Sequence, residues 1–238
     1  MTHTLVLTAA GESARMQGTG KKEYLTIAEP PTGRVSVLSS ALHPFLETGL
    51  FNLIVITVPS GGQAEARSVL AEDGRIYPLI EESGCEIIFA EGGSTRQDSV
   101  RRGLESIFLR ATTVKRWPTT VLVHDAARPW VTTATIRDVL ACALDRGAAV
   151  PAVPATDTQK ETDGLGKIVR HLDRSRVVSV QTPQGFRFTE LLDAHRKASI
   201  DGHHYTDDTE IWGVYAGDVY ICQGDRNNRK ITFREDIS

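Results

Sequence analysis

The chain has few cysteines, no excess of positive charge and no long apolar run, and each shortage excludes a class of protein. Three cysteines, Cys85, Cys142 and Cys222, form an odd, widely spaced set that indicates neither a disulfide framework nor a zinc site. Lys and Arg number 27 against 30 Asp and Glu, so there is no general basic field and we expect no binding to nucleic acid. Because no apolar run reaches bilayer-spanning length, we expect no membrane attachment.

The N-terminus enters an apolar segment at once, so we expect no signal peptide. Together with the isolated cysteines, this favours the reducing cytoplasm. Apolar residues make up 40% and charged residues 24% of the chain, a balance typical of a packed globular core. A chain of 238 residues fits one large α/β domain or two small ones, and we expect a single domain over residues 1–238.

Apolar strand-like segments alternate with segments of helical periodicity. We predict strands at residues 5–7, 53–58, 86–89 and 121–123, and helices at 37–46, 64–70 and 96–109. This alternation predicts a mostly parallel sheet covered by helices on both faces. In such sheets a ligand lies outside the carboxyl ends of the strands, where the strand order reverses. The rule places three stretches, residues 9–22, 90–96 and 124–129, on one edge of the sheet.

The first stretch is rich in small residues and is followed by two cations. Ala9, Ala10 and Gly11 come directly after the first strand, and backbone N–H groups at such a turn can hold an anion. Arg15 and Lys22 follow, so the stretch favours a triphosphate site. The plainer interpretation is a small strand-to-helix turn with a solvated lysine. The stretch matches neither G-x-x-x-x-G-K-[ST] nor G-x-G-x-x-G.

The second stretch contains Gly92 and Gly93, which allow a close approach of the backbone. Ser94 or Thr95 can cap the helix that begins near Arg96. We interpret the stretch as a base-recognition loop in which backbone groups and Ser99 read the edge of a flat heterocycle. The alternative is a capped turn with no ligand.

The third stretch places Asp125 at a strand end, three residues before Arg128. Asp125 can hold a divalent metal or a ribose hydroxyl. Arg128 can pair with an anionic substrate or with Asp125 itself, and a local ion pair is the plainer alternative.

Beyond residue 154 the pattern changes. Residues 156–172 are polar, with a Gly-rich centre, and predict a hairpin arm with too few apolar residues for a core of its own. Such an arm often packs on a partner subunit, so we expect a homodimer formed through an arm at about residues 155–178. We then predict a polar loop at 181–186, a helix at about 189–198, a helix start at 205–208 and a strand at 219–222. Asn227 lies close to Lys230 and supplies an amide that can ligate a metal.

Taken together, these segments resemble the 2-C-methyl-D-erythritol 4-phosphate cytidylyltransferase family of the non-mevalonate isoprenoid pathway. The matching motifs run in family order over nearly the whole chain: Ala9-Ala10-Gly11 with Arg15-Met16, Lys22-x-Tyr24-Leu25, Gly92-Gly93 with Arg96-x-Asp98-Ser99, Val123 to Pro129, Asp157-Thr158-x-Lys160, Asp173-Arg174, Gln181-Thr182-Pro183-Gln184-x-Phe186, Thr206-Asp207 and Lys230-x-Thr232. One such motif is weak, but nine in order are specific.

The resemblance implies a Rossmann-like nucleotidyltransferase fold, a three-layer α/β sandwich with a mostly parallel sheet and a protruding β-arm for dimerisation. It also implies CTP, magnesium and a sugar-alcohol phosphate as small-molecule substrates and cofactor. The implied catalytic residues are Arg15, Lys22, Arg174 and Lys230. The implied CTP-binding residues are Ala9, Ala10, Gly11, Gly93, Arg96, Ser99 and Asp125. The implied acceptor-binding residues are Arg128, Thr158, Thr182 and Thr206. The metal would lie at Asp125 and Asn227.

The sequence differs from the family pattern at a few positions. Glu23 stands where the family usually has Gln, and Asn227-Asn228 replaces an acidic residue often found before the lysine. Residues 29–34 resemble a loop insertion, and the usual C-terminal helix is absent after Thr232. A close alternative function is a ribitol-5-phosphate cytidylyltransferase, with the same chemistry and another acceptor. An alternative of a different class is a non-catalytic nucleotide-binding subunit.

Overall fold

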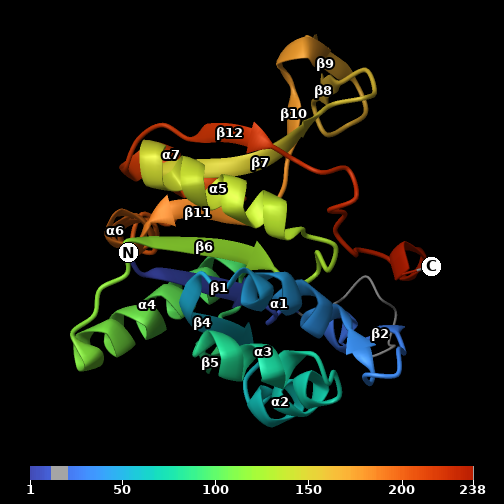
Figure 1. Cartoon of the computed structure of the whole chain (residues 1–238). Helices are drawn as coiled ribbons and strands as arrows, with labels where there is room; N and C mark the ends of the chain where they lie inside the picture. The colour runs from blue at the N-terminus through green and yellow to red at the C-terminus, as the bar shows by residue number, and fades with distance from the viewer. Residues whose placement is uncertain (12–20, 238) are drawn as a thin grey trace.

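A computed structural model describes residues 1–11 and 21–237, and its centre is a parallel sheet (Figure 1). Strand β1 (His3–Thr8) lies between β4 (Phe51–Val58) and β6 (Thr120–Asp125), parallel to both. Strand β5 (Glu86–Glu91) pairs in parallel with the far side of β4. The four predicted strands are confirmed. The apolar runs mark β1, β4 and β6, which are buried on both faces, and β5, a half-buried strand at the edge of the sheet.

The order of the parallel strands is β6-β1-β4-β5. The chain builds outward from β1 to β4 and β5, and then returns to the other side of β1 to form β6. The strand order therefore reverses between β1 and β6, which is where a ligand is expected in this class of sheet. Thr8 and Asp125, the last residues of the two strands, are register partners.

Helices cover both faces of the sheet. α1 (Val37–Thr48), α2 (Gln63–Ala71), α3 (Ile76–Ser83) and α5 (Thr133–Arg146) share one apolar core with Leu5 and Leu7. α4 (Arg96–Val114), α6 (Phe188–Ala198) and Trp212 of α7 (Asp208–Tyr215) share the other core with Val6. Successive side chains of a strand point to opposite faces, so β1 contributes to both cores. Among the helices in the described residues, none has the length and apolar composition needed to cross a bilayer.

The other half of the sheet is mixed. β7 (Ala148–Pro154) pairs with β10 (Val178–Val180), β12 (Tyr220–Gln223) and β11 (Gln184–Arg187), and β11 fills the gap between β6 and β7. The polar loop predicted at residues 181–186 is therefore wrong in part, since β11 is a buried antiparallel strand. Its polar Gln184 is tolerated there because the side-chain amide donates to Asp207 Oδ2 at 2.8 Å.

The predicted hairpin arm is present. β8 (Lys160–Thr162) pairs with β9 (Ile168–His171) in a sheet of their own. A 3₁₀ turn, η3 (Arg174–Arg176), leads back to β10. We call residues 155–178 the arm, and Figure 1 shows it projecting away from the rest of the chain.

Short elements frame the edge of the sheet where the ligand is expected. The 3₁₀ turn η2 (Lys22–Tyr24) precedes a small hairpin of β2 (Thr26–Ala28) and β3 (Val35–Ser36). We call residues 224–233, which follow β12, the C-terminal segment, and a last 3₁₀ turn, η4 (Arg234–Ile237), comes after it. The helices predicted at residues 37–46, 64–70, 96–109 and about 189–198 are confirmed as α1, α2, α4 and α6.

Candidate nucleotide-binding site

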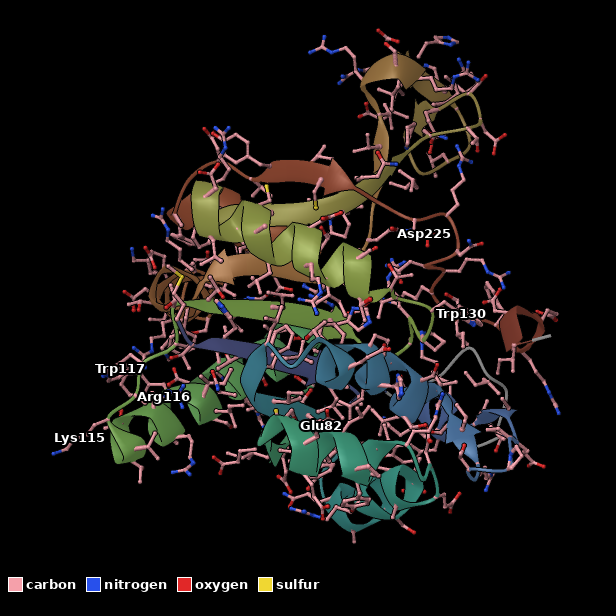
Figure 2. The ribbon with its side chains drawn as sticks, viewed as in Figure 1. Glu82, Lys115, Arg116, Trp117, Trp130 and Asp225 are labelled. Atoms are coloured by element: carbon pink, nitrogen blue, oxygen red, sulfur yellow. The ribbon has the colours of Figure 1, made fainter. Side chains whose placement is uncertain are left out.

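A cavity of about 520 Å³ opens at the carboxyl ends of the parallel strands. All three stretches that the sequence places on this edge contribute to it, so that prediction is confirmed for the described residues. The predicted site residues that line it are Ala10, Gly11, Lys22, Gly93, Arg96, Ser99, Asp125 and Lys230. Figure 2 shows Trp130, which follows β6, and Asp225, which follows β12, at one end of the molecule, opposite Trp117 beyond α4.

The turn from β5 to α4 forms one wall of this cavity and is braced by Ser99. The Ser99 hydroxyl accepts the N–H of Gly93 at 3.0 Å and donates to the carbonyl of Thr95 at 2.9 Å. The Thr95 side chain in turn caps α4 by accepting the Asp98 N–H. Ser99 is 4% exposed, so we infer that it fixes the backbone that would face a base.

Gly92 is required by close packing of two strand ends. A Cβ at this position would lie 2.2 Å from the Cβ of Ala10 and 2.9 Å from Ser99 Oγ. The turns after β1 and β5 therefore touch through a residue that has no side chain, and this contact keeps the cavity narrow.

The first prediction is that Gly92→Ala lowers the free energy of unfolding by about 1–3 kcal/mol, because the added methyl group overpacks this contact. We also expect weaker CTP binding, because the displaced atoms belong to both walls of the cavity. Urea unfolding and calorimetric titration with CTP measure the two effects. Gly213→Ala is the control, since a Cβ there meets no atom within 4 Å. Unchanged CTP affinity in Gly92→Ala contradicts the assignment of this wall.

Asp125 is the central carboxylate of the site and both its oxygens are engaged. Oδ1 accepts from Arg96 Nε at 3.0 Å and from the Thr8 hydroxyl at 3.3 Å. Oδ2 accepts from Lys230 Nζ at 2.6 Å. Burial opposes ionisation, but the charges of Arg96 and Lys230 prevail and hold the pKa of Asp125 well below its ordinary value. Asp125 is therefore an anion held between two cations.

A buried hydrogen-bond relay holds Asp125 from behind. Thr182 Oγ1 lies 3.1 Å from the Asp125 N–H and 2.8 Å from His124 Nδ1, and His124 Nε2 lies 3.1 Å from the Arg128 carbonyl. Burial lowers the pKa of His124 to about 4, so the imidazole is neutral. The carbonyl only accepts, so Nε2 carries the proton and Nδ1 accepts from the Thr182 hydroxyl. Thr182 thus positions Asp125.

The C-terminal segment closes the cavity. Lys22 Nζ donates to the carbonyl of Ile231 at 3.1 Å, and the Ile231 N–H donates to the carbonyl of Ala127 at 2.8 Å. Lys230 and Thr232 line the cavity on either side of Ile231. Two lysines from opposite ends of the chain therefore converge on one space, an arrangement that favours a polyanionic ligand.

Among the described residues, few side chains near Asp125 could act as further ligands for a metal ion. No three His, Cys, Asp or Glu side chains gather closely enough in residues 1–11 and 21–237 to hold one. Glu23, which is 3% exposed, is the other carboxylate that lines the cavity among the described residues, and it lies 3.7 Å from Lys21 Nζ. The predicted ligand Asn227 is exposed and lines neither this cavity nor the second one described below. The structure therefore does not bring Asn227 together with Asp125.

A second cavity, of about 400 Å³, adjoins the first and is basic. Among the residues that the structure describes, Arg128, Arg226 and Arg229 line it, together with the carboxylate of Asp157. Arg128 Nη1 donates to the carbonyl of Asn228 at 2.8 Å, and burial lowers the pKa of this guanidinium. The loop that begins at Asp125 and the C-terminal segment each line both cavities, so the two spaces are neighbours.

The chain is similar to known proteins in both sequence and fold. A family model described as "IspD: 2-C-methyl-D-erythritol 4-phosphate cytidylyltransferase" matches residues 3–238. The chain belongs to this family. The "Bifunctional enzyme IspD/IspF" of Rhodopseudomonas palustris strain HaA2 is 37% identical over 236 residues, which cover 98% of this chain and 53% of that protein. The chain thus spans about half the length of the curated relatives it matches.

Solved structures agree with the family assignment. The 2-C-methyl-D-erythritol 4-phosphate cytidylyltransferase of Thermus thermophilus superposes with a TM-score of 0.71 at 29% identity, covering 98% of this chain and 94% of that one. The 4-diphosphocytidyl-2C-methyl-D-erythritol synthase of Anaerococcus prevotii gives a TM-score of 0.78 at 21% identity, covering 99% and 92%, which supports the fold alone. The Rossmann-like nucleotidyltransferase fold predicted from the sequence is confirmed.

Other residues that the family resemblance singles out lie outside the first cavity. Ala9 is fully buried and donates its N–H to the Thr57 carbonyl, so it supplies no free N–H for an anion. Thr158 and Arg174 are exposed on the arm, and Arg174 Nη1 donates to the carbonyl of Thr156 at 2.9 Å. The exposed Thr206 donates its hydroxyl to Glu210 at 2.8 Å. Arg15 lies outside the described residues. The ligand contacts of these family positions stay predictions.

The sequence interpretation missed residues of two kinds. Pro59 and Ser60 follow β4 and line the cavity, and the rule that placed the other three turns at this edge predicts them as well. Asp208 contacts Arg96 from the start of α7 at 2.8 Å, and no spacing in the sequence predicts that contact.

Proposed function

We propose that the chain transfers the cytidylyl group of CTP to 2-C-methyl-D-erythritol 4-phosphate. A phosphate oxygen of the acceptor forms a bond to the α-phosphorus of CTP, the bond from that phosphorus to the bridging oxygen breaks, and pyrophosphate leaves. The product is 4-diphosphocytidyl-2-C-methyl-D-erythritol. The observation that carries the proposal is the meeting of Lys22, Lys230 and the narrow glycine-walled cavity in a member of this family.

The chemistry matches the residues of the cavity. The acceptor phosphate is already ionised at neutral pH, so the reaction needs no general base. Catalysis of phosphoryl-type transfer rests on positioning and on charge stabilisation. Lys22 and Lys230 are fixed by their contacts with Ile231 and Asp125, and are thus preorganised to stabilise charge that develops on the phosphates. We propose the same role for Arg15.

We propose that the acceptor occupies the second cavity. Its three guanidinium groups suit a sugar-alcohol phosphate, because arginine binds phosphate through paired N–H groups. The Nε of Arg128 is buried with no hydrogen-bond partner among the described residues, which leaves a donor for an acceptor oxygen. Lys230 lies on the segment between the two cavities and would contact the phosphate groups that react. We propose that Thr158 and Thr206 complete this site, and that Thr182, whose hydroxyl is committed to the Asp125 N–H and to His124, supports it from behind.

We propose that magnesium arrives with CTP. Mg²⁺ is usually bound by one or two carboxylates together with substrate phosphates. The cavity offers Asp125 and Glu23, and Asp125 is already paired with two cations. These residues fit an ion carried by the triphosphate and steadied by Asp125. The ion would neutralise charge on the phosphate oxygens, and Asn227 has no part in this proposal.

We propose that residues 1–238 form one functional unit that works as a homodimer through the arm. The arm leaves large apolar side chains in solvent: Leu165 is 93% exposed, Ile168 49% and Val169 53%. A second subunit that covers them would remove this apolar surface from water. Arg174 supports the same proposal. The family resemblance assigns it to a substrate site, but it lines neither cavity of its own chain, so we propose that it serves the site of the partner.

We also propose that the protein works in the reducing cytoplasm. Cys85, Cys142 and Cys222 are free thiols. Burial raises the pKa of the Cys85 thiol to about 12 and that of Cys222 to about 11, so both stay protonated and unreactive.

Pyrophosphate release with CTP and magnesium tests the function. We expect turnover with 2-C-methyl-D-erythritol 4-phosphate and little with ribitol 5-phosphate. The reverse preference assigns the alternative acceptor. No release with either acceptor, from protein that binds CTP, indicates a non-catalytic nucleotide-binding subunit.

The second prediction is that CTP is used well ahead of ATP and GTP. The base would face a wall in which Gly92 packs closely against Ala10, and we expect this wall to favour a pyrimidine over a purine. Competition assays with each nucleotide at equal concentration measure the preference, and UTP serves as the control for recognition of the base edge rather than of its size. Equal turnover with ATP contradicts the proposed function.

A further inference from the structure

A chain of charged side chains runs from the nucleotide cavity into the core beneath α6 and α7. Lys230 contacts Asp125 at 2.6 Å, Asp125 contacts Arg96 at 3.0 Å, and Arg96 Nη1 contacts Asp208 Oδ2 at 2.8 Å. The other oxygen of Asp208 lies 3.0 Å from His195 Nε2. The charges alternate in sign along the chain, so each inner group has partners on both sides.

The inner end of this chain is fully buried. The side chains of Asp208 and His195 are 0% exposed, and Arg96 is 27% exposed. A carboxylate in such a position needs partners to stay ionised. Burial opposes ionisation, but Arg96 and His195 lower the pKa of Asp208. Asp208 is therefore an anion that the core retains although it touches neither cavity.

Local structure explains how Asp208 is held. Asp207 caps α7 by accepting the Glu210 N–H at 2.9 Å, and this places Asp208 in the first turn. A carboxylate is favoured there by the helix dipole. His195 supports Asp208 from α6, and its Nδ1 has no partner among the described residues, which places the ring proton on Nε2, facing the carboxylate.

The two carboxylates fix the Arg96 guanidinium. Its Nε faces Asp125 and its Nη1 faces Asp208. Lys230, Arg96, Asp125 and Asp208 sum to zero charge. Without the Asp208 charge the sum becomes +1, and Arg96 is free to turn toward the phosphates of a bound nucleotide or to take Asp125 away from Lys230.

We propose that Asp208 is a positioning residue for the transfer reaction, acting through Arg96 to hold Asp125 and Lys230 in their reactive arrangement. The proposal rests on the proposed function. Through these ion pairs, the start of α7 is linked to the nucleotide cavity. The predicted acceptor contact Thr206 lies two residues before Asp208.

Steady-state kinetics of Asp208→Asn tests the proposal. We expect kcat/KM for CTP to fall about tenfold, the scale of coupling within a charged network, and most of the loss to be in kcat. The decisive readout is a double-mutant cycle with Arg96→Gln: in that background the same substitution should change kcat/KM less than about twofold, because the residue through which it acts is gone. The proposal is overturned if the losses of kcat/KM caused by Asp208→Asn and Arg96→Gln multiply in the double variant. It is also overturned if kcat/KM of Asp208→Asn equals that of the wild type.

Asp73→Asn is the matched control. Asp73 is also 0% exposed and forms an ion pair with Arg75 at 2.7 Å, but it lines neither cavity. We expect it to lower the melting temperature and leave kcat/KM within about twofold of wild type. Circular dichroism at the assay temperature checks that each variant is folded.

A second pair of variants covers the case in which Asp208→Asn does not fold. His195→Gln keeps a donor toward Asp208, and His195→Leu removes it. We expect near-normal turnover from the first and reduced turnover from the second, and equal turnover overturns the proposal. If the wild-type protein turns over neither acceptor, the proposed function fails first. In that case the role of Asp208 is tested by calorimetric measurement of CTP affinity. An unchanged CTP affinity in Asp208→Asn overturns the proposal for Asp208.

Discussion

Lys22→Ala is expected to lower kcat by about 100- to 1000-fold, which corresponds to about 2.7–4 kcal/mol for one preorganised donor. Lys22 lines the nucleotide cavity and its ammonium group is held 3.1 Å from the Ile231 carbonyl. A group fixed in this way before the reaction stabilises charge that grows in the transition state without further reorganisation. We therefore expect the KM for CTP to change much less than kcat.

The measurement is steady-state kinetics with both substrates varied, together with calorimetric CTP binding. Lys197→Ala removes the same charge from an exposed position on α6 and controls for net charge. A loss confined to KM contradicts a role in the transition state and assigns Lys22 to ground-state binding.

Mixing two inactive variants is expected to restore activity. Lys22 lines the cavity of its own chain, whereas Arg174 is exposed on the arm and lines neither cavity of that chain. If the arm crosses to a partner, Arg174 serves the partner's acceptor phosphate. A dimer of one Lys22→Ala chain and one Arg174→Ala chain then has one site with both lesions and one site with neither.

Unfolding and refolding the two variants together gives about half mixed dimers, and hence about a quarter of wild-type activity. The separately refolded variants, combined afterwards without exchange, are the control. No recovery, with mixed dimers demonstrated by mass spectrometry of differently tagged chains, contradicts a shared site and leaves the arm with a structural role.

The parallel half of the fold was predictable because its signals are local. The apolar runs at β1, β4 and β6 are buried on both faces, and the run at the edge strand β5 is half-buried, so all four indicate strands without tertiary information. The antiparallel half of the sheet was harder to predict from the sequence. β11 carries polar residues, and its burial depends on contacts from distant parts of the chain: it pairs with β6 and β7, Phe186 packs in the core, and the Gln184 amide donates to Asp207. α5 had clear local signals, Thr132 as its cap and Gly147 at its end, and it was missed all the same.

The site was predictable where it depends on strand ends and not where it depends on side-chain partners. Asp125 and Arg96 were both predicted as ligand contacts, but the structure pairs them with each other. Gly93 and Ser99 were predicted to read a base, and they are also hydrogen-bonded to one another. Contacts such as Arg96 with Asp208 join residues 112 positions apart, and no local pattern carries that information.

The wall made by the C-terminal segment has a consequence for biosynthesis. The parallel strands are complete once residue 125 has been made, but Lys230 and the Ile231 carbonyl, which hold Asp125 and Lys22, come more than 100 residues later. At ribosomal speeds of about 5–20 residues per second, a nascent chain spends about 5–20 s with its parallel core strands made and its nucleotide cavity open on one side. If nucleotide binds as proposed, it would stabilise only chains whose synthesis has passed residue 232, and ligand binding would then favour fully synthesised chains.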